Sequence, residues 1–186
     1  MSWSFTVEDG TGLTDSNSYA SVAEGDDYHA AQLRATDWTG ASNGDKQKAL
    51  AMATRLIDAE MDFFGWKSNQ GQALQWPRAL TRNPDVFDGY IGQPIQMTGR
   101  YFDYNKVPKE MKDATCEFAR VLLAEDRTAN PAGEGLKAVS IYQGISVTFD
   151  GPLHVQPVLH RIVTSMLSKL GVPKDSHTRS VKLHRA

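Results

Sequence analysis

The sequence is poor in cysteine and has no long apolar run. Cys116 is the single cysteine among 186 residues, so a disulfide within one chain is excluded. No stretch approaches the roughly 18 apolar residues of a membrane-spanning helix, and the N-terminus lacks the basic-then-apolar pattern of a signal peptide. We therefore expect a soluble, non-exported protein whose cysteine serves packing.

Motifs of catalysis and metal binding are missing as well. There is no phosphate-binding Walker loop, no Gly-x-Ser-x-Gly turn and no dinucleotide-binding glycine pattern. The five histidines show neither helical i, i+4 pairing nor cysteine partners; they are His29, His154, His160, His177 and His184. Asp58, Glu60 and Asp62 lie close together, but a solvated helix face explains them. We expect no enzymatic activity, no metal and no cofactor.

What the sequence does contain is typical of one globular domain with an uneven charge distribution. Hydrophobic residues make up 40% and charged residues 23% of the chain, which is ordinary for a folded domain. The net charge of −2 combines about +5 in residues 160–186 with about −7 in the rest. A basic tail on an acidic body suggests a partner for the tail, either nucleic acid or an acidic protein surface. A solvated terminus is the alternative.

Four segments have the periodicity and boundary signals of helices. Ser21 and Glu24 form a capping-box pattern, Asp45 is a candidate N-cap with Gly65 at the far end of its helix, and Pro108 suits a first helical position. A run of apolar residues after Pro157 stops at Gly171. The expected helices cover residues 22–33, 46–64, 108–126 and 157–170.

Between and around these helices we expect an N-terminal arm (1–20), a long irregular loop (65–107) and a β-hairpin (136–150). In the hairpin, apolar and polar residues alternate on both sides of Gly144. The loop is longer than connecting loops without a function usually are, so it is a candidate interaction surface.

The loop also interleaves aromatic residues with cations, which is the composition of a platform that stacks single-stranded nucleic acid. The residues in question are Trp66, Lys67, Trp76, Arg78 and Arg82. A different interpretation is that Trp76, before Pro77, fills a core beneath the loop.

Taken together, the motifs resemble those of a bacteriophage protein family labelled "DnaT-like single-stranded DNA-binding", whose members occur among head and tail morphogenesis proteins. The resemblance covers roughly residues 5–170 and is carried by residues 7–13 (VEDGTGL), 17–24 (NSYASVAE) with Tyr28, 49–54 (ALAMAT) with Ile57 and Asp58, Gly65, and 72–78 (QALQWPR). The later order of helix, hairpin and closing helix is similar to that of head–tail adaptor proteins.

This resemblance implies a mainly α fold: a four-helix adaptor-type bundle (1–171) with a small hairpin, followed by an extended basic tail (172–186). It implies a structural head–tail connector in the virion neck, assembled in the host cytoplasm as a ring of about twelve copies. Its partners would be the portal protein, a tail-side neck, tube or nozzle protein, and double-stranded DNA in the lumen; no membrane is involved. The alternative function is a single-stranded DNA-binding replication accessory protein.

We assign residues to these roles as follows. The portal would be bound by Val172, Lys174, Arg179, Val181, Lys182, Leu183 and Arg185. Contacts between subunits would involve Val139, Ile141, Val147, Phe149, Phe87, Tyr90, Tyr101 and Phe102. Under the alternative function, DNA would meet the aromatic and cationic residues of the loop named above. An acidic body argues against tight DNA binding, because affinity for phosphates depends on cations.

Overall fold

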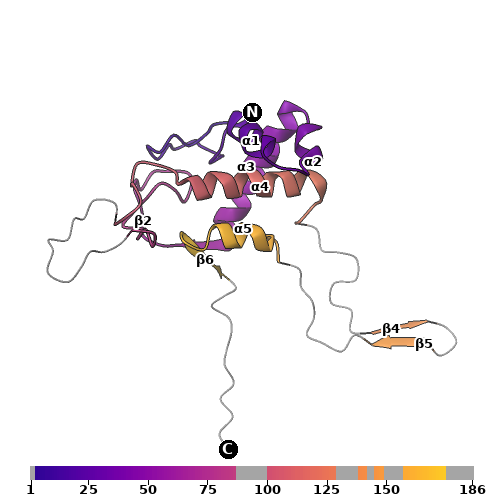
Figure 1. Ribbon diagram of the computed structural model, residues 1–186. Coiled ribbons are helices and arrows are strands. Elements are labelled where there is room, and N and C mark those ends of the chain that lie inside the picture. Colours follow the sequence, from indigo (N-terminus) through magenta and orange to yellow (C-terminus); the bar gives the residue numbers. More distant parts are fainter. Residues whose placement is uncertain (1–2, 87–99, 129–137, 142–144, 149–156, 175–186) are drawn as a thin grey trace, which may run out of the picture.

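The computed structural model describes residues 3–86, 100–128, 138–141, 145–148 and 157–174 (Figure 1). Within these ranges the chain forms five helices: α1 (Val22–Ala30), α2 (Thr36–Thr39), α3 (Asn43–Glu60), α4 (Lys109–Ala124) and α5 (Arg161–Met166). It also forms six short strands: β1 (Met61–Phe63), β2 (Trp66–Lys67), β3 (Arg78–Ala79), β4 (Ala138–Ile141), β5 (Ile145–Thr148) and β6 (Gly171–Pro173). The strands pair antiparallel as β1–β6, β2–β3 and β4–β5.

Helix α4 lies at the centre of the folded body, between α1 on one side and α5 on the other (Figure 1). It contacts all four other helices, and its most extensive partner is α3. Met111, Ala114 and Phe118 are fully buried on α4, at the three- and four-residue spacing that keeps side chains on one helix face. The hydrophobic core is therefore built around the α3–α4 pair. No helix in the described ranges is long and apolar enough to cross a membrane.

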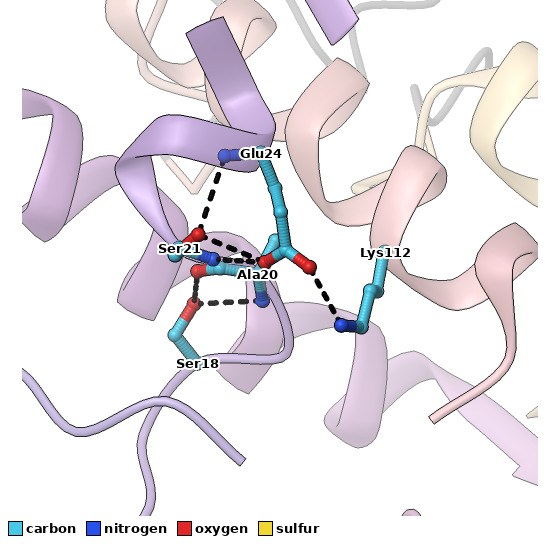
Figure 2. Close-up of polar contacts among 5 residues, drawn as sticks. All are labelled: Ser18, Ala20, Ser21, Glu24 and Lys112. Atoms are coloured by element: carbon cyan, nitrogen blue, oxygen red, sulfur yellow. Dashed lines mark hydrogen bonds and ion pairs between the residues drawn. The ribbon is translucent and has the colours of Figure 1, made fainter. Parts of the chain in front are cut away.

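The start of α1 follows the predicted capping box, and Figure 2 shows its contacts. The Ser21 hydroxyl accepts from the Glu24 amide at 3.2 Å, and the Glu24 carboxylate accepts from the Ser21 amide at 2.7 Å. The other carboxylate oxygen of Glu24 lies 2.6 Å from the Lys112 ammonium on α4. The Ser18 hydroxyl donates to the Ala20 carbonyl just before the cap. The capping box is confirmed, and it also ties α1 to α4.

The Gly-rich turn before this helix is organised by one buried carboxylate. Glu8 is only 1% exposed. Its oxygens accept from the amides of Gly10, Gly12 and Leu13 at 2.9–3.0 Å and from the Ser16 hydroxyl at 2.8 Å. Gly10 and Gly12 have positive φ angles of 102° and 79°, a backbone region that side chains disfavour. Residues 7–13 are thus a structural motif that fixes the N-terminal arm.

The expected four-helix adaptor-type bundle is wrong. The described residues form two long helices, α3 and α4, with three short ones, and the expected helix 46–64 is cut short by a strand. Helix α3 begins after Ser42, whose hydroxyl accepts from Asp45, and ends at Glu60 because residues 61–63 enter a sheet. Helix α5 spans six residues, whereas we expected 157–170. The pairing of β1 with β6 replaces the last turn of the expected helix 46–64, whereas residues 167–170 after α5 form hydrogen-bonded turns.

This β1–β6 ladder joins the end of α3 to the chain after α5. Asp62 lies opposite Val172, and the Lys174 ammonium donates to the Ala59 carbonyl. Val172 and Lys174, which we assigned to the tail, therefore belong to the folded body. The other five tail positions lie outside the described residues.

The β-hairpin is present where we predicted it. Val139 pairs with Val147 and Ile141 with Ile145 across β4 and β5. Phe149, Phe87 and Tyr90 lie outside the described residues. The contacts between subunits that we assigned to the hairpin stay a prediction.

Candidate nucleic-acid interface

Within the predicted loop, residues 66–67 and 78–79 pair as a short β-ladder. Trp66 pairs with Ala79, and Lys67 pairs with Arg78. Because successive side chains of a strand point to opposite faces, Lys67 and Arg78 share one face while Trp66 lies on the other. Gly65 permits this turn: its φ is 74°, and an added Cβ would lie 2.3 Å from the Ala79 carbonyl oxygen.

A second segment, residues 100–104, lies against this ladder. The Phe102 amide donates to the Thr81 carbonyl at 2.9 Å, and the Ser68 hydroxyl donates to the Tyr104 carbonyl at 2.5 Å. Arg82 and Tyr101 form an isolated antiparallel bridge. Two stretches of the predicted loop are thereby held together as one structured surface.

Three aromatic residues of this region are exposed. Trp66 is 73% exposed, Tyr104 65% and Tyr101 37%. The side chains of Lys67 and Arg82 are exposed as well; Lys67 lies on the ladder face opposite Trp66, and Arg82 pairs with Tyr101. We call these five residues, which occupy both faces of the ladder and the segment against it, the aromatic surface: Trp66, Lys67, Arg82, Tyr101 and Tyr104. Exposed rings with neighbouring cations are what a single-stranded nucleic acid requires for stacking and for phosphate contact.

Arg78 is committed to holding the ladder. Its guanidinium donates to the carbonyls of Phe64 at 2.8 Å and Gly65 at 2.7 Å, and to the side-chain oxygen of Gln75 at 3.1 Å. Burial lowers the pKa of this guanidinium. We infer a structural role for Arg78, because most of its donors are used within the chain.

Trp76 is fully buried, as the packing interpretation predicts. Its ring meets Phe63 and Phe102 edge to face, with centroids 6.2 and 6.3 Å apart. Such T-shaped pairs are a favoured packing of aromatic rings. No face of Trp76 is left for a base, and Phe102, which we assigned to a subunit contact, is half-buried in the same cluster.

A buried polar network holds the segment before Trp76 against α3. The Tyr19 hydroxyl donates to the Asp58 carboxylate at 2.6 Å and accepts from the Trp76 amide at 3.1 Å. The other oxygen of Asp58 accepts from the Gln75 amide at 3.0 Å. Burial raises the pKa of Asp58 to about 6 and that of Tyr19 well above its usual value. Our expectation of a solvated face is wrong for Asp58.

Sequence reasoning missed two parts of this region. Tyr104 was overlooked as a contact, although its segment alternates aromatic residues with polar ones. The Tyr19–Asp58 pair was missed because the two residues are 39 positions apart, and no local pattern signals such a contact.

Other chemistry has little support in the described part of the chain. No group of three or more His, Cys, Asp or Glu residues there is placed to hold a metal ion. Cys116 is buried on α4, and desolvation raises the pKa of its thiol to about 12, so it stays protonated and unreactive at neutral pH.

Comparison with known proteins gives one match. No curated protein and no solved structure matches the chain. A family model described as "Putative DnaT-like ssDNA binding protein" matches residues 3–186, which is nearly the whole chain.

This match overturns our main functional expectation. It describes a single-stranded DNA-binding protein, which was our alternative, and it gives no support to a head–tail connector, a portal-binding adaptor or a virion component. The resemblance to adaptor proteins rested on the order of helix, hairpin and closing helix, and the closing helix α5 spans six residues where we expected 157–170. The chain belongs to the family of putative DnaT-like single-stranded DNA-binding proteins.

Proposed function

We propose that this protein binds single-stranded DNA without sequence preference, as an accessory to a process that exposes single strands. The observation that carries the proposal is the aromatic surface, on which Trp66 and Tyr104 are 73% and 65% exposed beside Lys67 and Arg82. Every base presents a flat π-face, so stacking on such rings tolerates any sequence. The family description agrees with this chemistry.

The arrangement of the surface suits a flexible strand better than a duplex. Its rings come from short, twisted ladder segments, whereas a duplex keeps its base faces stacked inside and is read through helices or ribbons in its grooves. Stacking contributes roughly 1–3 kcal/mol per base. A few rings with few cations predict moderate affinity that falls as salt rises.

Removing the largest exposed ring tests the proposal. Trp66→Ala should weaken binding to a fluorescein-labelled oligo(dT) by about 5- to 150-fold, the equivalent of one lost stacking contact of 1–3 kcal/mol. Fluorescence anisotropy measures the affinity at low salt. The ring is exposed, so the variant should keep its helical circular dichroism.

Leu33→Ala is the control, because Leu33 is fully exposed in the connection between α1 and α2 and lies outside the aromatic surface. It should bind as the wild type does. The proposal fails if the wild type does not bind oligo(dT) at low salt, or if Trp66→Ala binds with unchanged affinity.

A further inference from the structure

A groove runs along α3, separate from the exposed ring of Trp66. It has a volume of about 890 Å³ and lies between α3, the segment 73–75 and the N-terminal arm. Pockets for organic ligands typically measure about 300–1,000 Å³. The lining is mostly apolar, with Met52 and Leu74 among its residues.

The helix side of the groove carries two cations. Lys48, Met52 and Arg55 line it from α3, and their spacing of three and four residues places them on one stripe of the helix. Lys48 and Arg55 are separated by about 10 Å along the helix axis. Lys48 pairs with the exposed Asp45 at 3.1 Å, while Arg55 is exposed and has no ion pair within the described residues.

The opposite side offers an aromatic ring and a hydrogen-bond donor. Trp3 lines the groove and is 52% exposed, with its ring 6.2 Å from that of Phe5. Gln75 also lines the groove. Its side-chain oxygen accepts from Arg78, and its NH₂ group has no partner among the described residues. A base could stack on the ring and accept a hydrogen bond from the amide.

The groove adjoins the β2–β3 ladder. Arg78 spans the two, because its guanidinium contacts Gln75 in the groove and the Phe64 and Gly65 carbonyls next to β2. Lys67 pairs with Arg78 across the ladder and shares its face. Lys48, Arg55 and Lys67 thus give cations from one end of the groove to the ladder.

We propose that this groove is a second section of the DNA path, in which bases of the same single strand lie on the apolar floor and against Trp3 while Lys48 and Arg55 contact phosphates. The inference rests on the proposed function. The occupant is a nucleic-acid strand because the groove combines an exposed ring, a spare amide donor and two spaced cations. An apolar peptide helix would need the floor but neither the cations nor the amide.

A charge reversal tests the groove. Arg55→Glu should weaken oligo(dT) binding at least about tenfold at low salt, because it replaces a phosphate contact by repulsion. Arg161→Glu, the same change at an exposed position of α5, should stay within about twofold of the wild type. Trp3→Ala should weaken binding by about fivefold or more through the lost ring. Circular dichroism confirms that each variant is folded.

The results distinguish a failure of the groove inference from a failure of the proposed single-stranded DNA binding. A wild type that does not bind oligo(dT) overturns both. If the wild type binds and Trp66→Ala weakens it, while Arg55→Glu and Trp3→Ala bind like the wild type, the DNA path excludes the groove and only this inference is overturned. If Arg161→Glu weakens binding as much as Arg55→Glu, the effect is one of overall charge and the groove inference also fails.

Discussion

Glu8 shows how one side chain can define a turn. Its carboxylate has four donors around it, three of them backbone amides, and it is buried with them. A carboxylate suits this position because both of its oxygens carry acceptor lone pairs. The glycines supply the positive φ angles and the acid supplies the acceptors, so residues 7–13 form one unit.

Glu8→Gln should therefore destabilise the protein although it is nearly isosteric. The new NH₂ group would face donors, either the Gly10 and Gly12 amides or the Leu13 amide and Ser16. A buried donor left without an acceptor costs about 1–3 kcal/mol. Urea denaturation followed by circular dichroism measures the loss. Asp15→Asn is a similar change on an exposed residue of the same arm, and it should leave the free energy of unfolding within about 0.5 kcal/mol of the wild type. Equal stability of the two variants would contradict the role of Glu8.

The helices and ladders differ in how far local sequence determines them. The capping box of α1 agrees with prediction, and α4 begins at Lys109, one residue after the predicted start at Pro108, because caps depend on residues within one turn. The strand after α3 could not be predicted, since β1 and β6 come from positions about 110 residues apart. Their pairing overrides the helical periodicity of residues 61–63.

The candidate site likewise contains residues that the sequence predicted and residues whose roles only the structure shows. Composition alone indicated that Trp66, Lys67 and Arg82 are suited to DNA, and they are exposed. The sequence already offered a packing role for Trp76 before Pro77, but it gave no reason to separate Arg78, whose donors are used in hydrogen bonds within the chain. Chain neighbours on a strand face opposite sides, so even the Trp66–Lys67 pair needs the ladder to be interpreted.

The packing of α1 on α2 depends on the absence of a side chain. Gly25 is buried on α1, and an added Cβ would lie 2.5 Å from the Trp38 ring. That ring is fully buried, and its indole N–H donates to Asp26 at 2.8 Å, so it has little room to move. The helix can approach Trp38 only with glycine at this position.

Gly25→Ala should consequently destabilise the protein by about 1–3 kcal/mol, the usual cost of overpacking a core, in spite of the better helix propensity of alanine. Thermal unfolding is a direct measurement. Gly44→Ala makes the same change on α3, where the new Cβ would meet only the Ser42 hydroxyl at 3.9 Å, and it should raise stability by up to about 1 kcal/mol. A stabilising Gly25→Ala would mean that Trp38 can move aside.

Viewed as a whole, the protein is acidic with local cations, which limits how it can hold DNA. The net charge is −2, so the average field repels a phosphate backbone, and binding must come from a few placed cations and from stacking. Lys67 and Arg82 on the aromatic surface, with Lys48 and Arg55 in the groove, are the cations that the described structure brings to the proposed path. This predicts a binding constant that depends on salt, though less steeply than for proteins with basic surfaces.

The salt dependence supplies the last prediction. Each phosphate contact on a single strand contributes about −0.7 to the slope of log K against log salt, so about three or four contacts predict a slope near −2 to −3. Lys67→Gln should reduce the magnitude of that slope by about 0.7, whereas Trp66→Ala should lower affinity with the slope unchanged, because stacking releases no counterions. Anisotropy titrations of oligo(dT) between about 50 and 200 mM salt measure both.

The control is Lys109→Gln, a change at an exposed cation paired with Asp113 on α4. It should leave both the slope and the affinity unchanged. A slope near zero would contradict the phosphate contacts. A slope that Trp66→Ala alters as much as Lys67→Gln does would contradict the assignment of stacking to the rings and of phosphate contacts to the cations.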